Sequence, residues 1–335
     1  MAATLKDLAK ATGLSLATLS KYINGGRVLE KNKIAIEAAI DELGYHVNTT
    51  ARSLKTRRSM TVGVLIPDLE NVFSTRIVSC LENKLLQAGY STLVCDYRSD
   101  EKLERERFGF LVERQIDGLL LMPTKTQAED LKLLKARQIP VVLIDRPILD
   151  SDCDAVLINN REAAYDAVTR LIENGHRRIA IISGPKGIYT ADERLQGYHD
   201  AIKAAGIPED ERLIREGRYD VASGYQMMQD LMKEPVCPTA VFITNHEMTF
   251  GAILALQSLG IIIPEQLSVI GFDNQELSSI LTPHLSIVLQ PLRQIGEKAA
   301  HLLLSRMDGK SGPARTYQLP ASWLPGASVA PPPEK

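Results

Sequence analysis

The chain has 335 residues, of which 44% are hydrophobic and 24% are charged, and its formal net charge is -2. No apolar run reaches the length needed to span a membrane, and no apolar signal core opens the chain, which argues against a membrane protein or an exported one. Four widely separated cysteines form no CxxC pair, so we expect reduced thiols and a cytoplasmic location.

Charge is distributed unevenly along the chain. Residues 1 to 60 contain ten Lys and Arg and five Asp and Glu, a net charge of +5, so the remaining residues must carry -7 to give the total of -2. A basic head on an acidic body is typical of a protein that binds phosphate groups through one small part of its length.

Two short helical patterns meet at a glycine-containing turn between Thr4 and Asn24. Thr4 and Asp7 have capping-box spacing, Thr12 to Leu14 breaks the first helix, and Ser15 can cap a second helix. A third helical pattern from Lys31 to Leu43 allows three helices to enclose a small core. This arrangement predicts a helix-turn-helix DNA-binding head over residues 1–47, and the alternative is a helical hairpin packed inside a larger domain.

In a helix-turn-helix the second helix enters the major groove of DNA and its first residues reach base edges. Neither Leu16 nor Ala17 can make a bidentate bond to a base, although both can contact a thymine methyl group, which leaves Thr18 and Lys21 for polar contacts. The head residues that we expect at the DNA are Thr4, Ser15, Leu16, Ala17, Thr18, Lys21 and Asn24.

Residues 59–335 form a body too long for one hydrophobic core, so two lobes are expected. Continuous apolar runs of strand length alternate with amphipathic stretches, which predicts two doubly wound parallel sheets covered by helices on both faces. The predicted strands are TVGVLI at 61, STLVCD at 91, DGLLLM at 117, PVVLID at 140, RIAIIS at 178, TAVFIT at 239 and LSVIGF at 267. Helices are predicted from about Thr75, Glu104, Arg161, Glu193, Ala222 and Glu247, and over Leu292 to Met307.

Polar residues follow most of these strands. Ligands of doubly wound folds bind beyond the carboxyl ends of the strands, so these positions are the candidates for a binding site. Asp68, Asp145, Asn245 and Asp273 occupy such ends. Carboxylates, an amide and arginine suit the hydroxyl groups of a sugar or the edge of a purine.

The chain resembles the lac repressor and galactose repressor family of bacterial transcription regulators from about Thr4 to Trp323. The resemblance rests on TLKDLAKATGLSLATLSKYING, ELGYHVNTTARSLKT, RLQGY at 194 to 198, the strand ending in Asp273, and LQP at 289 to 291. It implies a repressor with a helix-turn-helix head, a hinge helix over residues 48–58 and a body like the periplasmic binding proteins. By itself, the polar segment from Asn48 to Lys55 is typical of a linker.

The resemblance implies that the segment from Thr49 to Lys55 forms a hinge helix on operator DNA, paired with the same segment of a second subunit. Leu54 then corresponds to a wedge inserted into the minor groove, with Arg52 and Lys55 beside it. A single helix-turn-helix contacts one half-site, so a homodimer on a pseudo-palindromic operator is expected. The tail has no leucine heptads that would join dimers into a tetramer.

The resemblance also implies an effector site between the two lobes. We expect the first lobe over residues 59–159 and 291–320, and the second lobe over residues 160–290 and 321–330. A small polar effector, with a sugar favoured, would change operator affinity. Where the family commonly has Asp, this chain has His246, a departure that bears on the charge or pH preference of the site. The expected effector residues are Asp68, Phe73, Asp145, Arg194, Tyr219, Asn245, His246, Asp273 and Gln290.

Other classes of function remain open. One alternative is a purine-type corepressor, and another is a regulator whose main signal is a protein docked on the body. A free-standing sugar-binding module would not need the basic head, and an enzyme would need a catalytic constellation. The six histidines are scattered, and no nucleophile elbow, phosphate loop or zinc spacing is present, so we expect no catalysis, no metal and no cofactor.

Overall fold

The computed structural model describes residues 3–23, 26–45, 58–273 and 275–333. It divides into two compact units, Met1–Met60 and Thr61–Lys335, here called the head and the body. No helix among the described residues is both long and apolar enough to cross a membrane. The four cysteines are free thiols.

The head consists of three helices, α1 (Leu5–Thr12), α2 (Leu16–Ile23) and α3 (Glu30–Leu43). The predicted capping box is present, because the Thr4 amide donates to Asp7 Oδ2 at 2.8 Å and the Asp7 amide donates to Thr4 Oγ1 at 3.4 Å. Gly13 ends α1 in the left-handed conformation, with φ of +67°. The core of the head is formed by buried Leu8, Leu19, Ile36 and Ala39.

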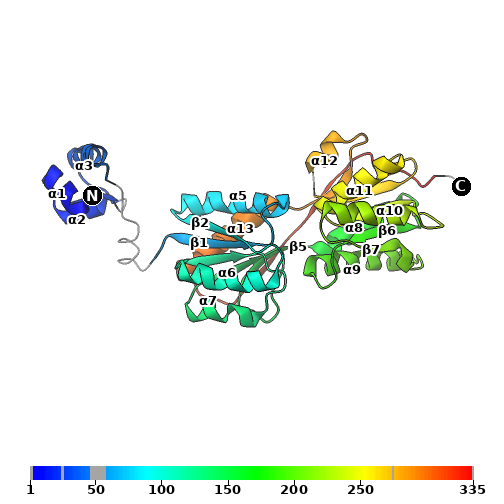
Figure 1. Ribbon diagram of the computed structural model, residues 1–335, viewed down its shortest axis with the longest axis horizontal. Coiled ribbons are helices and arrows are strands. Elements are labelled where there is room, and N and C mark those ends of the chain that lie inside the picture. Colours follow the sequence, from blue (N-terminus) through cyan, green and yellow to red (C-terminus); the bar gives the residue numbers. More distant parts are fainter. Residues whose placement is uncertain (1–2, 24–25, 46–57, 274, 334–335) are drawn as a thin grey trace. The chain divides into compact units, whose positions relative to one another are not determined.

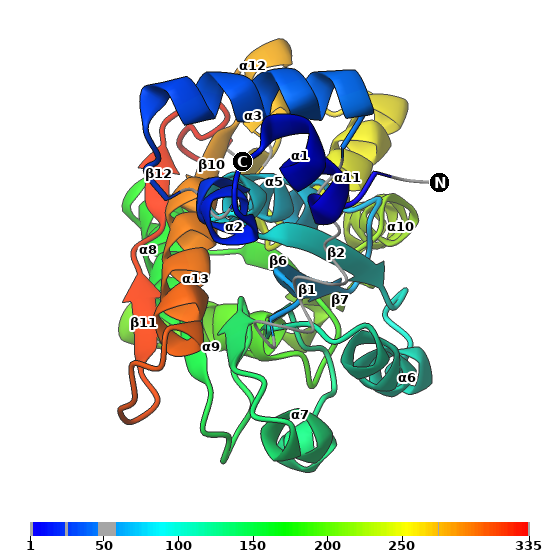
Figure 2. The same cartoon turned by 90° about the vertical axis from the view of Figure 1, so that its left-hand side faces the viewer.

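The first lobe of the body is built on a six-stranded sheet with the order β11-β5-β4-β3-β1-β2, in which all pairs are parallel. Helices α5 and α13 pack together on one face, and α6 and α7 lie on the other (Figures 1 and 2). The strands are β1 (Thr61–Ile66), β2 (Ser91–Asp96), β3 (Gly118–Leu121), β4 (Val141–Ile144), β5 (Asp154–Ile158) and β11 (Thr316–Leu319). The helices are α5 (Val72–Gln87), α6 (Glu101–Glu113), η1 (Ala128–Leu131), α7 (Lys132–Ala136) and α13 (Leu292–Met307).

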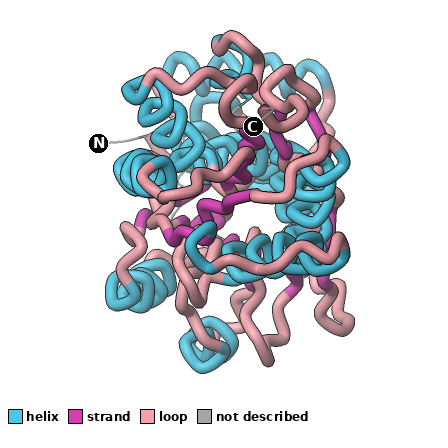
Figure 3. The backbone as a smooth tube through the Cα atoms, turned by 90° about the vertical axis from the view of Figure 1, so that its right-hand side faces the viewer, coloured by secondary structure: helices cyan, strands magenta, loops and turns pink. Residues whose placement is uncertain are grey.

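The second lobe is built on a six-stranded sheet with the order β12-β10-β9-β8-β6-β7, in which only the β10–β12 pair is antiparallel. Figure 3 shows its strands between layers of helices, with α8 packed on α9 and α10 on α11. The strands are β6 (Ile179–Ser183), β7 (Ile214–Glu216), β8 (Ala240–Ile243), β9 (Ser268–Phe272), β10 (Ser286–Leu289) and β12 (Ser322–Leu324). The helices are α8 (Asn160–Glu173), α9 (Tyr189–Ala204), η2 (Glu211–Leu213), α10 (Val221–Met232), α11 (His246–Leu259) and α12 (Gln275–Ile280).

The strands that the sequence did not predict carry polar residues or lie at sheet edges. β5 begins with Asp154, whose charge argues against a strand at the sequence level. Burial alone raises the pKa of this carboxyl, but hydrogen bonds from Arg306, at 2.7 and 2.8 Å, and from the Arg315 amide hold the pKa below its usual value of 3.8. The predicted starts of α5, α6 and α9 are three to four residues too late.

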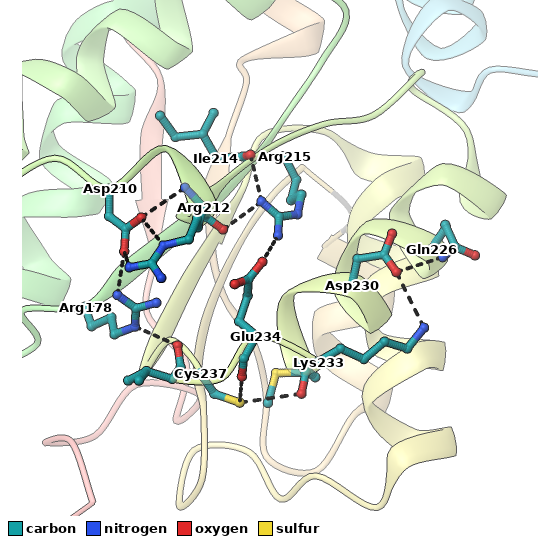
Figure 4. Close-up of polar contacts among 12 residues, drawn as sticks. Arg178, Asp210, Arg212, Ile214, Arg215, Gln226, Asp230, Lys233, Glu234 and Cys237 are labelled. Atoms are coloured by element: carbon teal, nitrogen blue, oxygen red, sulfur yellow. Dashed lines mark hydrogen bonds and ion pairs between the residues drawn. The ribbon is translucent and has the colours of Figure 1, made fainter.

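Edge strand β7 has only three residues, and ion pairs hold the chain around it in place (Figure 4). Arg178 donates to Asp210 at 2.7 Å and to the Val236 carbonyl at 2.8 Å, and Arg215 donates to Glu234. These contacts join β7 and the turn before it to the start of β6 and to the segment that follows α10. Exposed edges without such restraints are prone to pair with other chains.

The chain crosses between the lobes at three places, after β5, after β10 and after β11. Asn159 joins two of these crossings, because its amide donates to the Leu319 carbonyl at 3.2 Å and its Oδ1 accepts from the Ala321 amide at 2.8 Å. The C-terminal segment is fixed separately through buried His176, which contacts Ser268 Oγ at 3.0 Å and the Ala330 carbonyl at 2.9 Å. The crossings therefore form a hydrogen-bonded hinge.

The head core predicts a sharp effect of one substitution. Leu19→Ala removes a fully buried side chain, and such changes cost about 2–5 kcal/mol, which a core of four buried residues cannot absorb. We expect the head of the full chain to become sensitive to protease while the thermal transition of the body stays unchanged. Leu16→Ala on the same helix, where the side chain is 45% exposed, is the control and should leave the head resistant. Equal resistance of both variants would contradict this account of the core.

Candidate functional site

A cavity of about 390 Å³ opens between the two lobes at the carboxyl ends of their strands. The structure places all nine of the predicted effector residues in its lining. They belong to the ends of β1, β4, β9 and β10, to the starts of α5 and α11, to α9 and to the turn before α10. The residues are Asp68, Phe73, Asp145, Arg194, Tyr219, Asn245, His246, Asp273 and Gln290.

Arg194 is buried on the floor of the cavity, and several groups fix its guanidinium. Nε donates to Asn160 Oδ1 at 2.8 Å, and one terminal nitrogen donates to the Thr244 carbonyl at 2.7 Å. The guanidinium carbon lies 3.8 Å from the ring centre of Phe272, an arrangement that stabilises a cation. The second terminal nitrogen has no partner among the described residues and is available to a ligand.

Asp273 follows β9 and is held by Gln290, which lies where the chain leaves β10 to cross into the first lobe. Its Oδ1 accepts from the Gln290 amide at 3.0 Å, and its Oδ2 accepts from Gln290 Nε2 at 2.7 Å. Burial raises the pKa of Asp273, and the Gln290 hydrogen bonds and nearby Arg194 oppose that rise only in part. Oε1 of Gln290 is buried without a partner in the described part of the chain. The pair therefore offers an acceptor to a ligand hydroxyl or N–H group.

Asp145 follows β4 from the opposite lobe. It is 9% exposed, and its Oδ2 lies 3.3 Å from Arg146 Nε, within ion-pair distance but without hydrogen-bond alignment. Asp145, Tyr219 and Asp273 have φ of +71°, +62° and +56°, in the left-handed region that non-glycine residues rarely adopt. Such strain costs about 1–3 kcal/mol per residue and is typical of functional sites.

Two aromatic residues line the cavity from different lobes, Phe73 from the first turn of α5 and Tyr219 from the turn before α10. The Tyr219 hydroxyl lies 3.3 Å from Thr190 Oγ1. Its ring covers Gly184, where an added Cβ would approach the ring to 2.2 Å. Gly184 is thus required for the position of Tyr219, and aromatic faces at both lobes suit a ring-shaped ligand.

His246 is the first residue of α11, and Asn245 caps this helix by accepting the Met248 amide at 2.9 Å. Burial lowers the pKa of His246 below its usual value of 6.5. Glu247, whose Oε1 is 3.7 Å from Nε2, opposes this shift only in part. The imidazole is therefore neutral at pH 7 and can donate or accept a hydrogen bond. Nearby, Arg76 of α5 forms an ion pair with Glu276 of α12 that joins the two lobes.

Sequence analysis missed a buried polar network behind the first-lobe side of the cavity. Glu104 is 1% exposed and accepts hydrogen bonds from the Thr124 amide and the Thr126 hydroxyl. The Tyr97 hydroxyl donates to the Met122 carbonyl and contacts Thr124 Oγ1. Burial raises the pKa values of Glu104 and Tyr97. The partners are 20 residues or more apart in sequence, so no local pattern could have revealed them.

In the head, α2 presents an exposed face that contains Leu16, Ala17 and Lys21. Thr18 is partly buried, and its hydroxyl lies 2.9 Å from Ser15 Oγ, which also accepts the Thr18 amide at 3.2 Å. Thr4 is occupied in the capping box of α1. The predicted DNA contacts Asn24, Thr49, Arg52, Leu54 and Lys55 lie outside the described residues.

Two family models match separate parts of the chain. Residues 4–48 match the model for bacterial regulatory proteins of the lacI family, and residues 168–329 match a periplasmic binding protein-like domain. The HTH-type transcriptional repressor PurR of Pectobacterium carotovorum subsp. carotovorum (strain PC1) is 35% identical over 331 residues, which cover 98% of this chain and 97% of the relative.

Two solved structures show the same fold over nearly the whole chain. A lac repressor dimer bound to operator and the anti-inducer ONPF has a TM-score of 0.87 at 26% identity and covers 98% of this chain and 100% of its own. A complex of the transcriptional regulator CelR with cellobiose has a TM-score of 0.73 at 31% identity and covers 97% of this chain and 99% of its own.

Asp273→Asn tests the effect of burying this acid. Burial raises the pKa of Asp273, so the fold favours the neutral acid more than the unfolded chain does, and stability from this group is full below pH 3.8 and falls as pH rises through the raised pKa. Asn tolerates a left-handed φ, and the Gln290 amide can turn to accept from it. We expect the Tm of the variant minus that of the wild type to grow as the pH rises above 3.8 and to level off above the raised pKa. Exposed Asp152→Asn should show a constant difference, and a constant difference for both variants would contradict the prediction.

Proposed function

This chain belongs to the lacI family of bacterial regulatory proteins and is a DNA-binding transcriptional repressor, not an enzyme, and we propose that a small polar effector in the cavity between its lobes controls its affinity for operator DNA. The observation that carries this proposal is the convergence of all nine candidate residues on that one cavity. The site of action is the cytoplasm, on the chromosome.

A sugar or sugar derivative is the effector class that the unused hydrogen-bonding groups favour. Asp145 and Gln290 Oε1 offer acceptors, whereas Arg194 offers a fixed cationic donor. Each sugar hydroxyl both donates and accepts, so it matches such a mixed set. The CelR structure was solved with cellobiose, and ONPF is an anti-inducer of the lac repressor.

A purine-type corepressor is the second candidate, and one observation favours it. Phe73 and Tyr219 line the cavity from opposite lobes, so a flat heterocycle could stack on an aromatic side chain. Asp145 and Asp273 would accept its ring and exocyclic N–H groups. A sugar would instead place its apolar ring face on Tyr219 and its hydroxyls on the carboxylates.

DNA is contacted by the exposed face of α2, with Leu16 and Ala17 against base edges and Lys21 on a base or a phosphate. The hinge segment from Thr49 to Lys55, with Leu54 as a minor-groove wedge between Arg52 and Lys55, supplies the second contact. Effector binding changes the angle between the lobes and with it the spacing of two hinge segments in a dimer. A coupling free energy of about 1–3 kcal/mol changes operator affinity about 5- to 150-fold.

Dimerisation uses an exposed apolar patch on the second lobe, formed by Phe250 and Leu254 of α11, which are 39% and 37% exposed. Phe250 and Leu254 are four residues apart and share one helix face. Large exposed apolar side chains of this kind mark protein interfaces.

A thermal-shift screen of sugars, sugar phosphates and purines against the full chain tests the effector proposal. A ligand at 100 times its Kd stabilises the folded state by about 2.7 kcal/mol. Asp145→Asn should weaken the ligand found by about 10- to 100-fold, because a hydrogen bond to a charged group contributes about 1.5–3 kcal/mol. Arg194→Ala is less informative, since it also removes the donor to Asn160 Oδ1 and to the Thr244 carbonyl.

The matched control for that screen is Asp152→Asn, which changes an exposed aspartate paired with Lys135. It should bind the ligand like the wild type. Both variants should retain operator affinity without ligand. Failure of every ligand class to stabilise the wild-type chain would reject the effector proposal.

Phe250→Asp tests the dimer. A charge in an apolar interface is left without water or a partner, so we expect sedimentation at monomer mass and a loss of at least about tenfold in operator affinity. Leu149→Asp is the control, because Leu149 is 83% exposed on the first lobe and lies outside the patch. A Phe250→Asp chain that remains dimeric would place the interface elsewhere.

A further inference from the structure

A second cavity of about 490 Å³ adjoins the effector cavity. Phe73, His246, Asp273 and Gln290 line both cavities and therefore stand at their border. Each cavity alone falls in the range of about 300–1,000 Å³ that is typical of small-molecule sites. The space between the lobes thus has two chambers that meet at these four residues.

The lining of the second chamber differs from that of the first. Apart from the border, it consists of apolar and uncharged polar side chains and two arginines: Val72, Ser79, Cys80, Gln275, Leu289, Leu292, Ser322, Arg76 and Arg293. Arg76 pairs with Glu276, and Arg293 donates to Glu297 at 2.9 Å, so both cations are already neutralised. The first chamber, in contrast, contains buried Asp145 and Arg194 with unused hydrogen-bonding capacity.

Gln290 at the border has one unsatisfied atom. The residue is 9% exposed, its Nε2 is used by Asp273, and its Oε1 is buried with no partner among the described residues. An acceptor in that state requires a donor, which a ligand that passes from one chamber to the other can supply. His246 also lines both chambers, and burial lowers the pKa of its imidazole. A neutral imidazole can exchange a hydrogen bond with an uncharged group, whereas a charged group would lose its hydration there without gaining a partner of opposite charge.

We infer that the effector has two parts: a polyhydroxylated unit held in the first chamber, and an uncharged second unit in the second chamber, with a hydroxyl near the junction donating to Gln290 Oε1. This inference rests on the proposed function and narrows its ligand class to a disaccharide or a glycoside with an apolar aglycone. The apolar contacts come from Val72, Leu289 and Leu292, whereas Ser79, Gln275 and Ser322 supply neutral hydrogen bonds. A simple monosaccharide leaves the second chamber and Gln290 Oε1 unused.

Calorimetric titration of the full chain with matched ligands tests whether the effector has two parts. The probes are glucose and galactose, their methyl and phenyl β-glycosides, their 6-phosphates, and cellobiose and lactose. We expect a phenyl glycoside or disaccharide to bind at least about tenfold more tightly than its monosaccharide. Ser79→Trp, which places a large side chain in the second chamber alone, should remove that gain and change monosaccharide affinity less than about twofold.

Asn83→Trp is the matched control, because Asn83 is exposed on the same helix and lines neither chamber. It should leave the gain intact. Ser322→Trp fills the second chamber from the other side and gives an independent test should Ser79→Trp fold poorly. Circular dichroism of each variant establishes folding.

The outcomes separate this inference from the proposal beneath it. Equal affinity for monosaccharides and their extended forms, tighter binding of the 6-phosphates, or equal weakening of short and long ligands by both tryptophan variants would each overturn the two-part effector and leave a sugar effector standing. Absence of binding by every probe would reject the sugar effector itself, and the two-part effector with it.

Discussion

The hydrogen bonds from Gln290 to Asp273 connect the binding cavity to the hinge of the body. Asp273 ends β9 in the cavity, and Gln290 lies where the chain leaves β10 to cross into the first lobe. Because both the backbone and the side chain of Gln290 donate to one buried carboxylate, that carboxylate cannot move independently of the crossing. Under the proposed effector mechanism, a ligand that bonds to Asp273 or to Gln290 Oε1 acts directly on a segment that connects the two lobes.

The interaction free energies indicate that the hydrogen-bonded crossings of the chain, rather than the exposed ion pair between the lobes, govern the angle between the lobes. Arg76 and Glu276 form the one ion pair between the lobes found among the described residues, and their side chains are 45% and 62% exposed. Solvent-exposed pairs contribute about 0–1 kcal/mol. The crossings, in contrast, are joined through Asn159 and Gln290 by hydrogen bonds in partly or fully buried positions. An effector with a coupling of about 1–3 kcal/mol outweighs the surface pair.

The sequence predicted the parts of the fold that depend on local patterns. Continuous apolar strands and the polar residues that follow them, such as Asp145 and Asp273, were sufficient to locate one edge of each sheet, since parallel strands bring their carboxyl ends together. Strand β5 was missed because Asp154 needs a partner, Arg306, that lies 152 residues away. Asn160 and Glu104 were missed for the same reason: their roles depend on Arg194 and on the Thr124 loop, which the fold alone brings near them.

The cavity, the sheets of the body and the head differ in how much they contribute to the stability of the fold. Four cavity residues, Ser99, Asp145, Tyr219 and Asp273, have left-handed backbone conformations, and Asp273 is an acid whose burial disfavours its charged form, so the site itself is a source of strain. The central strands of the two sheets, β3, β5, β6, β8 and β9, are buried throughout and compensate for that strain in the body. The head has four buried core residues and no such reserve. The strained cavity therefore rests on a large buried scaffold, whereas the head depends on its small core alone.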